Sequence, residues 1–216
     1  MKRIAVHQPN FFPWAGFFMK MKLSDVFVLY DDVQFTKGSY INRSKAVLAN
    51  QTDAEWVTMP VNYHYLQKIN AVRIAEPQKN IFPVLEKLRF AYPNSFHIWQ
   101  DVIDLNDDRL AVMNEAVIRA IAKRINATCE IVRSSDLKQK AEDSTERLIK
   151  ICKYFGGDIY VTGIGGKNYL DEGKFKAAGI HVKYKDFSTH IDGRTGYMTK
   201  VEDVTALKYL PTFKIY

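Results

Sequence analysis

The chain has 216 residues, 47% of them hydrophobic and 25% charged, and these proportions exclude an intrinsically disordered protein. The formal net charge is +7, yet the lysines and arginines are spread among acidic residues, with no basic block and no nucleic-acid-binding motif. We therefore expect no nucleic acid as partner. A mildly basic surface suits an anionic small molecule, such as a sugar nucleotide or ATP.

Cysteine and histidine usage argues against a disulfide framework and against a metal site. The two cysteines, Cys129 and Cys152, fall in a strand-like run and on the apolar face of a predicted helix, where reduced buried thiols are common. The five histidines show no ligand-like spacing. No apolar run approaches the roughly 20 residues of a membrane helix, and the start "MKRIAVHQPN" turns polar too soon for a signal peptide. We expect a cytoplasmic protein without a membrane span.

The first half of the chain predicts two strands around a helix, followed by a small β insertion. Residues 2–7 form an apolar run that predicts a strand, and a helix is expected from about Pro13 to Lys22, because proline is favoured in a first turn. Residues 25–35 have the continuous apolar centre of a buried parallel strand. Two further strands, joined by a polar loop, are expected to form an antiparallel insertion over about 55–75.

The second half alternates helices with strands. Apolar residues at spacings of three and four predict a helix over about 107–126, and "CEIVRSS" predicts a strand after it. A capping box at Asp143 predicts the next helix, which ends at Gly156-Gly157. The strand "DIYVTG", the turn "GIGGKN", a helix to about Ala178 and the strand "IHVKYKDF" follow.

This alternation predicts an α/β fold with a three-layer, mostly parallel sheet of Rossmann-like or nucleotidyltransferase-like type. We expect one domain over residues 1–216, ending in a segment of different character over about 188–216. Because such sheets bind ligands beyond the carboxyl ends of their strands, four loops should lie together. They are residues 7–13, 31–43, 162–168 and 186–190.

The motif "HQPN" supplies polar side chains at the first strand end. His7 brings a group that titrates near neutral pH, and Gln8 and Asn10 bring hydrogen-bond donors for an anion or a carbonyl. The alternative is that His7 and Asn10 only cap the helix and satisfy the turn. Among the aromatic residues that follow, we expect one or two, including Trp14, to line a pocket wall, because one helix face cannot bury them all.

The motifs "YDDVQF" and "SYINRSK" follow the second predicted strand. Asp31 and Asp32 point to opposite faces in an extended chain, so one is expected to serve the site and the other to cap a turn or pair with a cation such as Arg43. Asn42 and Arg43 suit recognition of phosphate or carboxylate, the alternative being a solvated turn.

The motif "TGIGGKNY" is a glycine-rich turn between a strand and a helix. Such a turn lets backbone amides approach a phosphate, which makes a phosphate-binding site of Thr162, Gly163, Gly165, Gly166 and Lys167. Its spacing differs from the Walker loop and from the dinucleotide fingerprint. A tight turn without ligand is the alternative. The sequence contains neither a nucleophilic serine framed by glycines nor a cysteine with an activating histidine nearby in the sequence. Covalent acyl-enzyme chemistry is therefore not indicated.

Taken in order, "HQPNFFPWAGFFMKM", "SDVFVLYDDVQF", "SYINRSK", "STERLIKICKYFGGDIYVTGIGGKNYL" and "GIHVKYKDF" resemble the WbqC-like protein family. The likeness covers about Arg3 to Phe187. The tail 188–216 departs from the family pattern, and Tyr40 stands where tryptophan is usual. The resemblance implies a role in bacterial surface-polysaccharide (O-antigen) biosynthesis, with acyl or aminoacyl transfer to an amino sugar or a nucleotide-linked amino sugar. We expect the substrate to be bound by Gln8, Trp14, Gln34, Asn42 and Arg43.

A strand ending in His-x-x-Asn is also similar in layout to pantothenate synthetase, with Pro9 and Asn10 in place of the usual glycine and second histidine. Three functions remain open. In acyl transfer, from a carrier such as acyl-CoA, His7 or an aspartate takes the amine proton while Asn10 and Gln34 hold the oxyanion. In an ATP-dependent ligase, His7 and Lys167 stabilise the phosphates of an acyl-adenylate reaction. The third is a non-catalytic module that binds an anion or a sugar nucleotide. The oligomeric state is left open.

Overall fold

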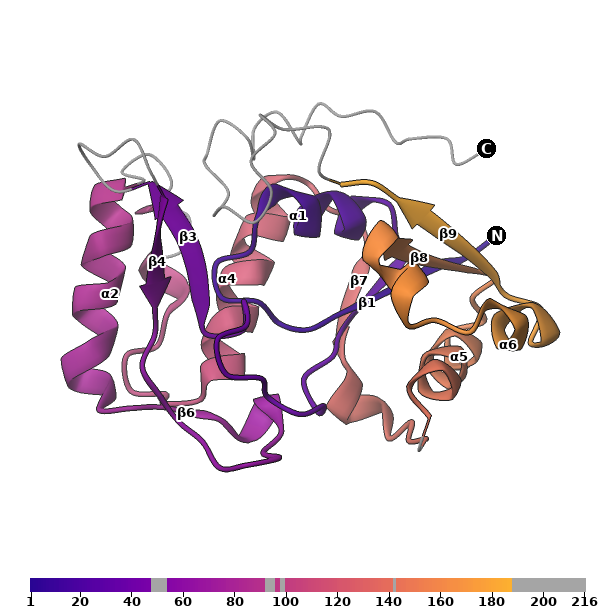
Figure 1. Ribbon diagram of the computed structural model, residues 1–216. Coiled ribbons are helices and arrows are strands. Elements are labelled where there is room, and N and C mark those ends of the chain that lie inside the picture. The colour runs from indigo at the N-terminus through magenta and orange to yellow at the C-terminus, as the bar shows by residue number, and fades with distance from the viewer. Residues whose placement is uncertain (48–53, 92–95, 98–99, 142, 188–216) are drawn as a thin grey trace.

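The computed structural model describes residues 1–47, 54–91, 96–97, 100–141 and 143–187 (Figure 1). Its centre is a sheet of five parallel strands in the order β7-β2-β1-β8-β9. The strands are β1 (Arg3–His7), β2 (Val26–Leu29), β7 (Glu130–Arg133), β8 (Ile159–Gly163) and β9 (His181–Lys185). The predicted tail 188–216, with His190, lies outside the described residues.

Helices cover both faces of this sheet. Successive residues of a strand point to opposite faces, so each face carries apolar side chains that a helical layer buries, and two separate cores result. Ala5 and Phe27 pack into the larger core, whereas Ile4 and Val26 pack into the smaller one. The larger core also receives α1 (Ala15–Lys22) and α4 (Leu110–Arg124), and the smaller one receives α5 (Ser144–Tyr154) and α6 (Glu172–Ala177). The fold is therefore a three-layer, Rossmann-like α/β fold, as the sequence predicts.

The inserted β structure begins earlier and pairs differently than the sequence predicts. Four short strands form two antiparallel pairs, and the first predicted strand is divided at Pro60, which has no N–H to donate to a ladder. The pairs are β3 (Arg43–Val47) with β4 (Ala54–Thr58), and β5 (Val61–Asn62) with β6 (Arg73–Ile74). The short helices η1 (Ile69–Ala71) and η2 (Gln100–Val102) and the helix α2 (Pro77–Ala91) complete this part.

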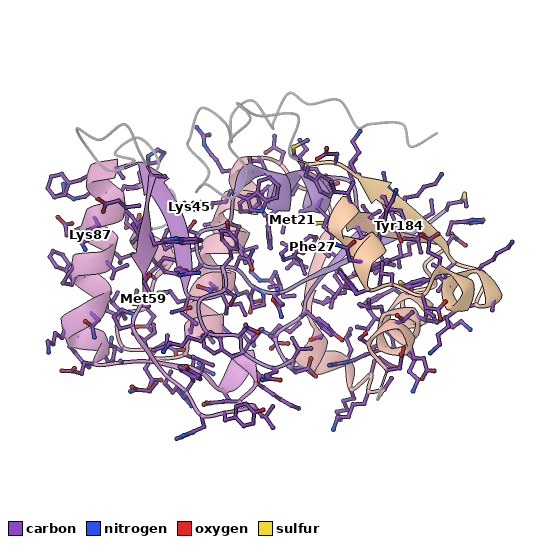
Figure 2. The ribbon with its side chains drawn as sticks, in the orientation of Figure 1. Met21, Phe27, Lys45, Met59, Lys87 and Tyr184 are labelled. Carbon is purple, nitrogen blue, oxygen red and sulfur yellow. The ribbon has the colours of Figure 1, made fainter. Side chains whose placement is uncertain are left out.

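The insertion shares the larger core with the main sheet. That core contains Met21 from α1, Phe27 from β2 and Met59, which directly follows β4 (Figure 2). Figure 1 shows α2, β3 and β4 beside α4, at a distance from the parallel strands. None of the helices in the described part of the chain is long and apolar enough to cross a bilayer.

Gly157 is a position where the backbone of the α5–β8 turn closely approaches β1. A Cβ built on Gly157 would lie 2.3 Å from Cγ1 of Ile4, a fully buried side chain of the smaller core. We expect Gly157→Ala to lower the free energy of unfolding by about 1–3 kcal/mol, the usual cost of overpacking. Gly165→Ala is the control, because a Cβ there meets nothing within 4 Å. Urea denaturation of both variants measures the difference, and equal stabilities would contradict the expectation.

Candidate functional site

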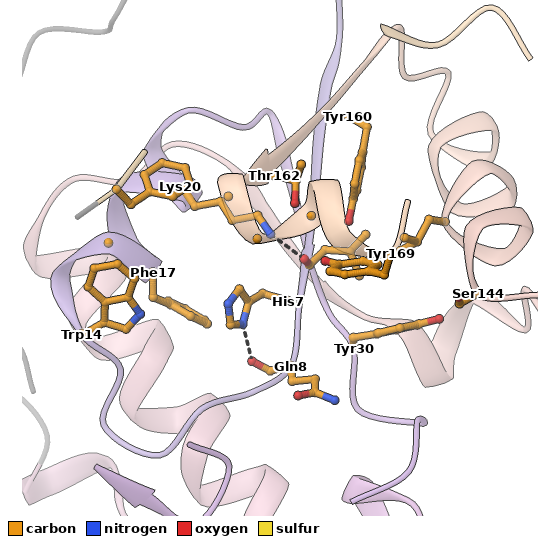
Figure 3. A pocket seen from close by; sticks show the side chains of 17 residues that line it. His7, Gln8, Trp14, Phe17, Lys20, Tyr30, Ser144, Tyr160, Thr162 and Tyr169 are labelled. Carbon is orange, nitrogen blue, oxygen red and sulfur yellow. Dashed lines mark hydrogen bonds between the residues drawn. The ribbon is translucent and has the colours of Figure 1, made fainter. Parts of the chain in front are cut away.

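The order of the parallel strands indicates where a candidate functional site lies. From β1 the chain adds β2 and then β7 on one side, and it returns to place β8 on the other side of β1. In sheets of this kind ligands bind where the order reverses, at the carboxyl ends of the two neighbouring strands. Here a pocket of about 490 Å³ lies at that place, between the ends of β1 and β8 (Figure 3).

One wall comes from β1, the loop after it and α1. His7, Gln8, Trp14 and Phe17 line this wall. His7 Nδ1 donates to the Gln8 carbonyl at 3.0 Å, so its Nε2 keeps the lone pair of the ring. The Phe17 ring meets the imidazole edge-on, with centroids 4.9 Å apart. Burial, followed by the nearby charge of Lys20, lowers the pKa of His7 to about 3. His7 is therefore neutral at physiological pH.

Lys20 is a pocket residue that the sequence analysis missed. Its side chain is buried, and its Nζ donates to the Val6 carbonyl of β1 at 2.8 Å (Figure 3). Burial lowers the pKa of this amine to about 7, so its charge changes near neutral pH. The signal in the sequence is a lysine within the run "AGFFMKM", whose seven residues are all buried in α1. A buried lysine beside a cavity is a frequent feature of functional sites.

The glycine-rich turn forms the wall opposite to α1. Thr162, Gly163, Gly165 and Gly166 line the pocket, as the phosphate-site hypothesis requires of them. The turn is a short 3-10 segment, η4 (Ile164–Asn168), rather than the start of a long helix. Lys167 points elsewhere: it does not line the pocket, and its Nζ lies 5.3 Å from the centre of the Tyr184 ring.

Aromatic side chains complete the remaining wall. Tyr30 follows β2, Tyr160 belongs to β8, and Tyr169 follows η4, and all three line the pocket (Figure 3). Phe187 also lines it, which brings the described beginning of the predicted loop 186–190 to the site. None of these four aromatic residues is expected at the site from the sequence, because aromatic residues beside strands usually belong to a core. Their rings give the pocket a partly apolar lining.

The two adjacent aspartates lie outside this lining. Both carboxylate oxygens of Asp32 accept from Nη2 of Arg147 in α5, at 2.6 and 2.5 Å, and the expected pairing of Asp32 with Arg43 is not formed. Arg43 lies over the Trp56 ring instead, 4.0 Å from the ring centre. Burial opposes ionisation of Asp32, but hydrogen bonds from Ser134 and Arg147 outweigh it and lower the pKa of the carboxyl. The Asp32 carboxylate is therefore ionised, and its oxygens are already bonded to Arg147 and Ser134.

Asp31 shares Ser134 with Asp32 but has Ser135, rather than Arg147, as its second partner. Its carboxylate accepts hydrogen bonds from Ser134 Oγ at 3.1 Å and from Ser135 N and Oγ at 3.0 and 2.7 Å. These bonds join the end of β2 to the end of β7. Asp31 is buried and lines a second, smaller cavity.

Three of the predicted site residues lie away from the pocket. Asn10 is buried but does not line it, and Gln34 is exposed and forms an isolated bridge to Lys68. Asn42 is buried, and its Nδ2 donates to the Met59 carbonyl at 3.0 Å. Gln34 and Asn42 are expected at the strand ends because their loop begins there, but that loop continues into the insertion. Asn10 lies in the short connection between β1 and α1, where its side chain is buried.

The loop that carries "QPNFF" is held by backbone and amide hydrogen bonds from the insertion and α4. Phe11 N donates to the Tyr40 carbonyl at 2.8 Å, and Ser44 Oγ donates to the Phe12 carbonyl at 3.0 Å. Asn114 Nδ2 donates both to the Pro9 carbonyl at 2.9 Å and to the Ile41 carbonyl at 2.8 Å. The "SYINRS" stretch therefore positions the pocket loop.

The phenylalanines of this region are buried more completely than predicted. Phe11, Phe12, Phe17 and Phe18 are all at most 1% exposed, because the insertion covers the side of the loop that α1 cannot cover. Two aromatic residues, Trp14 and Phe17, nevertheless contribute to the pocket wall. Within the described residues no group of three or more histidine, cysteine, aspartate and glutamate side chains is placed to hold a metal ion.

His7 gives a prediction about stability in acid. Its pKa is lowered from 6.5 to about 3 in the folded protein, so between these values the unfolded chain binds more protons. The free energy of unfolding should therefore fall as pH decreases through this window, by up to about 1.4 kcal/mol per pH unit, and His7 should add no pH dependence above 6.5. We expect His7→Asn to flatten this slope. Urea denaturation between pH 4 and pH 8 measures it, and parallel curves for the two proteins would refute the assignment.

The fold and the pocket define a doubly wound α/β protein with a cavity at its topological switch point. The WbqC-like protein family matches residues 8–206, and the chain belongs to this family. A protein of Mycobacterium tuberculosis described as the uncharacterized protein Rv1507c is 29% identical over 203 residues, covering 89% of this chain and 85% of that protein. No solved structure gives a significant match.

Proposed function

We propose that this protein transfers an acyl or aminoacyl group to the amine of a nucleotide-linked amino sugar, in the biosynthesis of a bacterial surface polysaccharide. The observation that carries the proposal is the placement of the Lys20 amine and the glycine-rich turn around one pocket at the carboxyl ends of β1 and β8. A cation and a flexible backbone turn at a switch point suit a phosphate-bearing substrate.

The pocket offers separate contacts for the parts of such a substrate. Protonated Lys20 attracts the diphosphate, and the turn from Gly163 to Gly166 lets the chain approach it closely. Tyr30 and Tyr169 provide flat apolar surface for a base or a sugar ring. The volume of about 490 Å³ falls within the range of ligand pockets, roughly 300–1,000 Å³.

The acyl-transfer step assigns His7 a role as hydrogen-bond acceptor. A sugar amine that attacks an acyl carbonyl must be neutral, and the same burial that lowers the pKa of Lys20 favours the neutral form of a substrate amine. The lone pair of His7 Nε2 then accepts an N–H of this amine and orients it toward the carbonyl of an acyl thioester. As the C–N bond forms, the C–S bond of the thioester breaks, and the departing thiolate takes the proton that the amine loses. Asp31 and Asp32 lie outside the lining and take no part in this step.

An ATP-dependent amide-forming ligase is the second candidate. The glycine-rich turn beside Lys20 would accommodate the phosphates of ATP as well as those of a sugar nucleotide. Its reaction would form an acyl-adenylate and release pyrophosphate, and the amine would then displace AMP. Lys167 lies away from the pocket, so in this route Lys20 takes the role first expected of Lys167.

Thermal-shift measurements test the binding part of the proposal. The purified protein is screened against ATP, acyl-CoA compounds and nucleotide-linked sugars and amino sugars, since a ligand at 100 times its dissociation constant stabilises by about 2.7 kcal/mol. We expect a shift with amino-sugar nucleotides that Lys20→Met loses. Lys22→Met is the matched control, because Lys22 lies on the same helix and contacts the Ile125 carbonyl rather than the pocket.

Turnover then separates the candidates. Mass spectrometry of mixtures of amino-sugar nucleotide with acyl-CoA, or with ATP and a carboxylic acid, detects the N-acylated product. Product formed without ATP supports the transferase, and product that requires ATP and yields AMP supports the ligase. Binding without product from either mixture would contradict both, and would leave a module that only binds sugar nucleotides.

A further inference from the structure

A second cavity lies at the same edge of the sheet, over the ends of β2 and β7. Its volume is about 200 Å³, less than half that of the first pocket. Residues from the β1 loop, both strand ends, η1 and the first two turns of α4 line it, among them Pro9, Asp31, Arg109, Glu115 and Arg133. Pro9 and Asp31 follow directly on Gln8 and Tyr30 of the first pocket, so these two stretches of chain separate the cavities.

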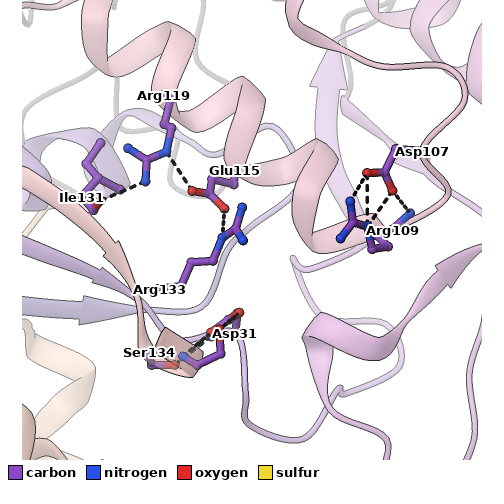
Figure 4. A network of polar contacts seen from close by, with 9 residues as sticks. Asp31, Asp107, Arg109, Glu115, Arg119, Ile131, Arg133 and Ser134 are labelled. Carbon is purple, nitrogen blue, oxygen red and sulfur yellow. Dashed lines mark hydrogen bonds and ion pairs between the residues drawn. The ribbon is translucent and has the colours of Figure 1, made fainter. Parts of the chain in front are cut away.

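The carboxylates of this cavity already have partners (Figure 4). Glu115 accepts from Arg119 Nε at 2.8 Å with one oxygen and from Arg133 Nε with the other. Both oxygens of Asp31 accept hydrogen bonds from Ser134 and Ser135. Neither carboxylate has an oxygen left without a partner, so the cavity offers little to a cation or an ammonium group.

The arginines of this cavity, in contrast, keep unused donors. Arg133 uses Nε for Glu115, and its Nη1 and Nη2 have no hydrogen-bond partner among the described residues. Arg109 uses Nε and Nη2 for Asp107, which leaves Nη1 without a partner in the same part of the chain. Guanidinium groups with free N–H donors bind carboxylate and phosphate oxygens well, because their geometry is fixed and their charge is permanent.

We propose that this second cavity binds a small oxyanion, a carboxylate or a phosphate, through Arg109 and Arg133. A volume of about 200 Å³ admits such a group with a short substituent but no nucleotide. The proposal is independent of the function proposed for the first pocket. It places a second anionic group next to the first site, with the Gln8–Pro9 and Tyr30–Asp31 stretches between them.

Nuclear magnetic resonance titration of the full chain tests this proposal, with acetate and inorganic phosphate as separate probes. We expect saturable shifts of the backbone amides of Ala111, Val112 and Ser135, which line the cavity. Loss of one charged hydrogen-bond donor should weaken binding by about ten-fold or more in Arg133→Gln and in Arg109→Gln. Arg119→Gln is the matched control, because it also removes one partner of Glu115 but does not line the cavity.

The Lys20→Met variant separates this site from the first pocket. Binding that survives Lys20→Met and Arg119→Gln, and that both cavity variants lose, supports the proposal. If acetate alone shifts these amides, the ligand is a carboxylate; if phosphate alone shifts them, it is a phosphate. If neither probe shifts these amides, or if binding is lost in Lys20→Met and kept in Arg133→Gln, the proposal is wrong whatever the first pocket does.

Discussion

Arg147→Ala is expected to lower the free energy of unfolding by about 3–5 kcal/mol, the usual cost of removing one partner from a buried ion pair. The Arg147 and Asp32 side chains are only 11% and 12% exposed, and Arg147 also lies 4.7 Å from the centre of the Tyr30 ring. Without the guanidinium, the Asp32 carboxylate would remain buried with Ser134 as its side-chain partner. Urea denaturation at pH 7 measures the loss.

The ion pair between Arg89 and Glu86 supplies the control for this prediction. It is also at short distance, 2.7 Å, but its arginine is 45% exposed and it lies within one turn of α2. Arg89→Ala should therefore cost less than about 1 kcal/mol. The double variant Asp32→Asn with Arg147→Ala should recover part of the loss, since no unpaired charge remains. A loss below 1 kcal/mol in Arg147→Ala would show that the buried pair does not connect the β2 end to α5 as described.

The second large effect is a pH dependence of anion binding that comes from Lys20. A phosphate-bearing ligand binds the protonated amine, whose pKa is about 7 in the free protein. The amine is about half protonated at pH 7 and about 1% protonated at pH 9, so the affinity for UDP should weaken by about 50-fold between these values. The phosphates themselves have finished titrating in this range. Isothermal titration calorimetry at several pH values measures the profile.

Two variants test whether Lys20 is the group that titrates. His7→Asn should keep the profile above pH 7, because the pKa of His7 is about 3. Lys20→Met should bind weakly at every pH. Between about pH 7 and pH 10.5 the lysine is protonated in the unfolded chain but not in the folded one, so it makes the free energy of unfolding of the unmodified protein rise with pH. Lys20→Met should lack this rise. A profile that is unchanged in Lys20→Met would exclude Lys20 as the titrating group.

The sequence predicts the parallel sheet well because its strands are short apolar runs bounded by polar residues. The strand-end rule then places His7 and Thr162 near each other, although they are far apart in the chain, and both line the pocket. The rule fails for Gln34 and Asn42, because the chain between β2 and β4 leaves the sheet edge and builds the insertion. Proximity to a strand end in sequence does not fix where a long loop goes.

Long-range partners could not be predicted from the sequence. Arg147 pairs with Asp32 across 115 positions of the chain, whereas Arg43, only eleven positions away, was the local choice. Lys20 was missed for a related reason: a lysine in a helix is usually solvated, and only the packing of α1 against the sheet and its neighbours buries this one. Both errors concern charges that tertiary packing moves out of water.

The amide of Asn114 has a consequence for how the pocket is formed. It bonds the Pro9 carbonyl across 105 positions and the Ile41 carbonyl across 73 positions. During synthesis the loop after β1 therefore cannot reach its final position until α4 has been made, and contacts of such separation form slowly. Chains that stop before α4 lack this anchor as well as the β8 and η4 wall of the pocket, so we expect them not to bind the ligand.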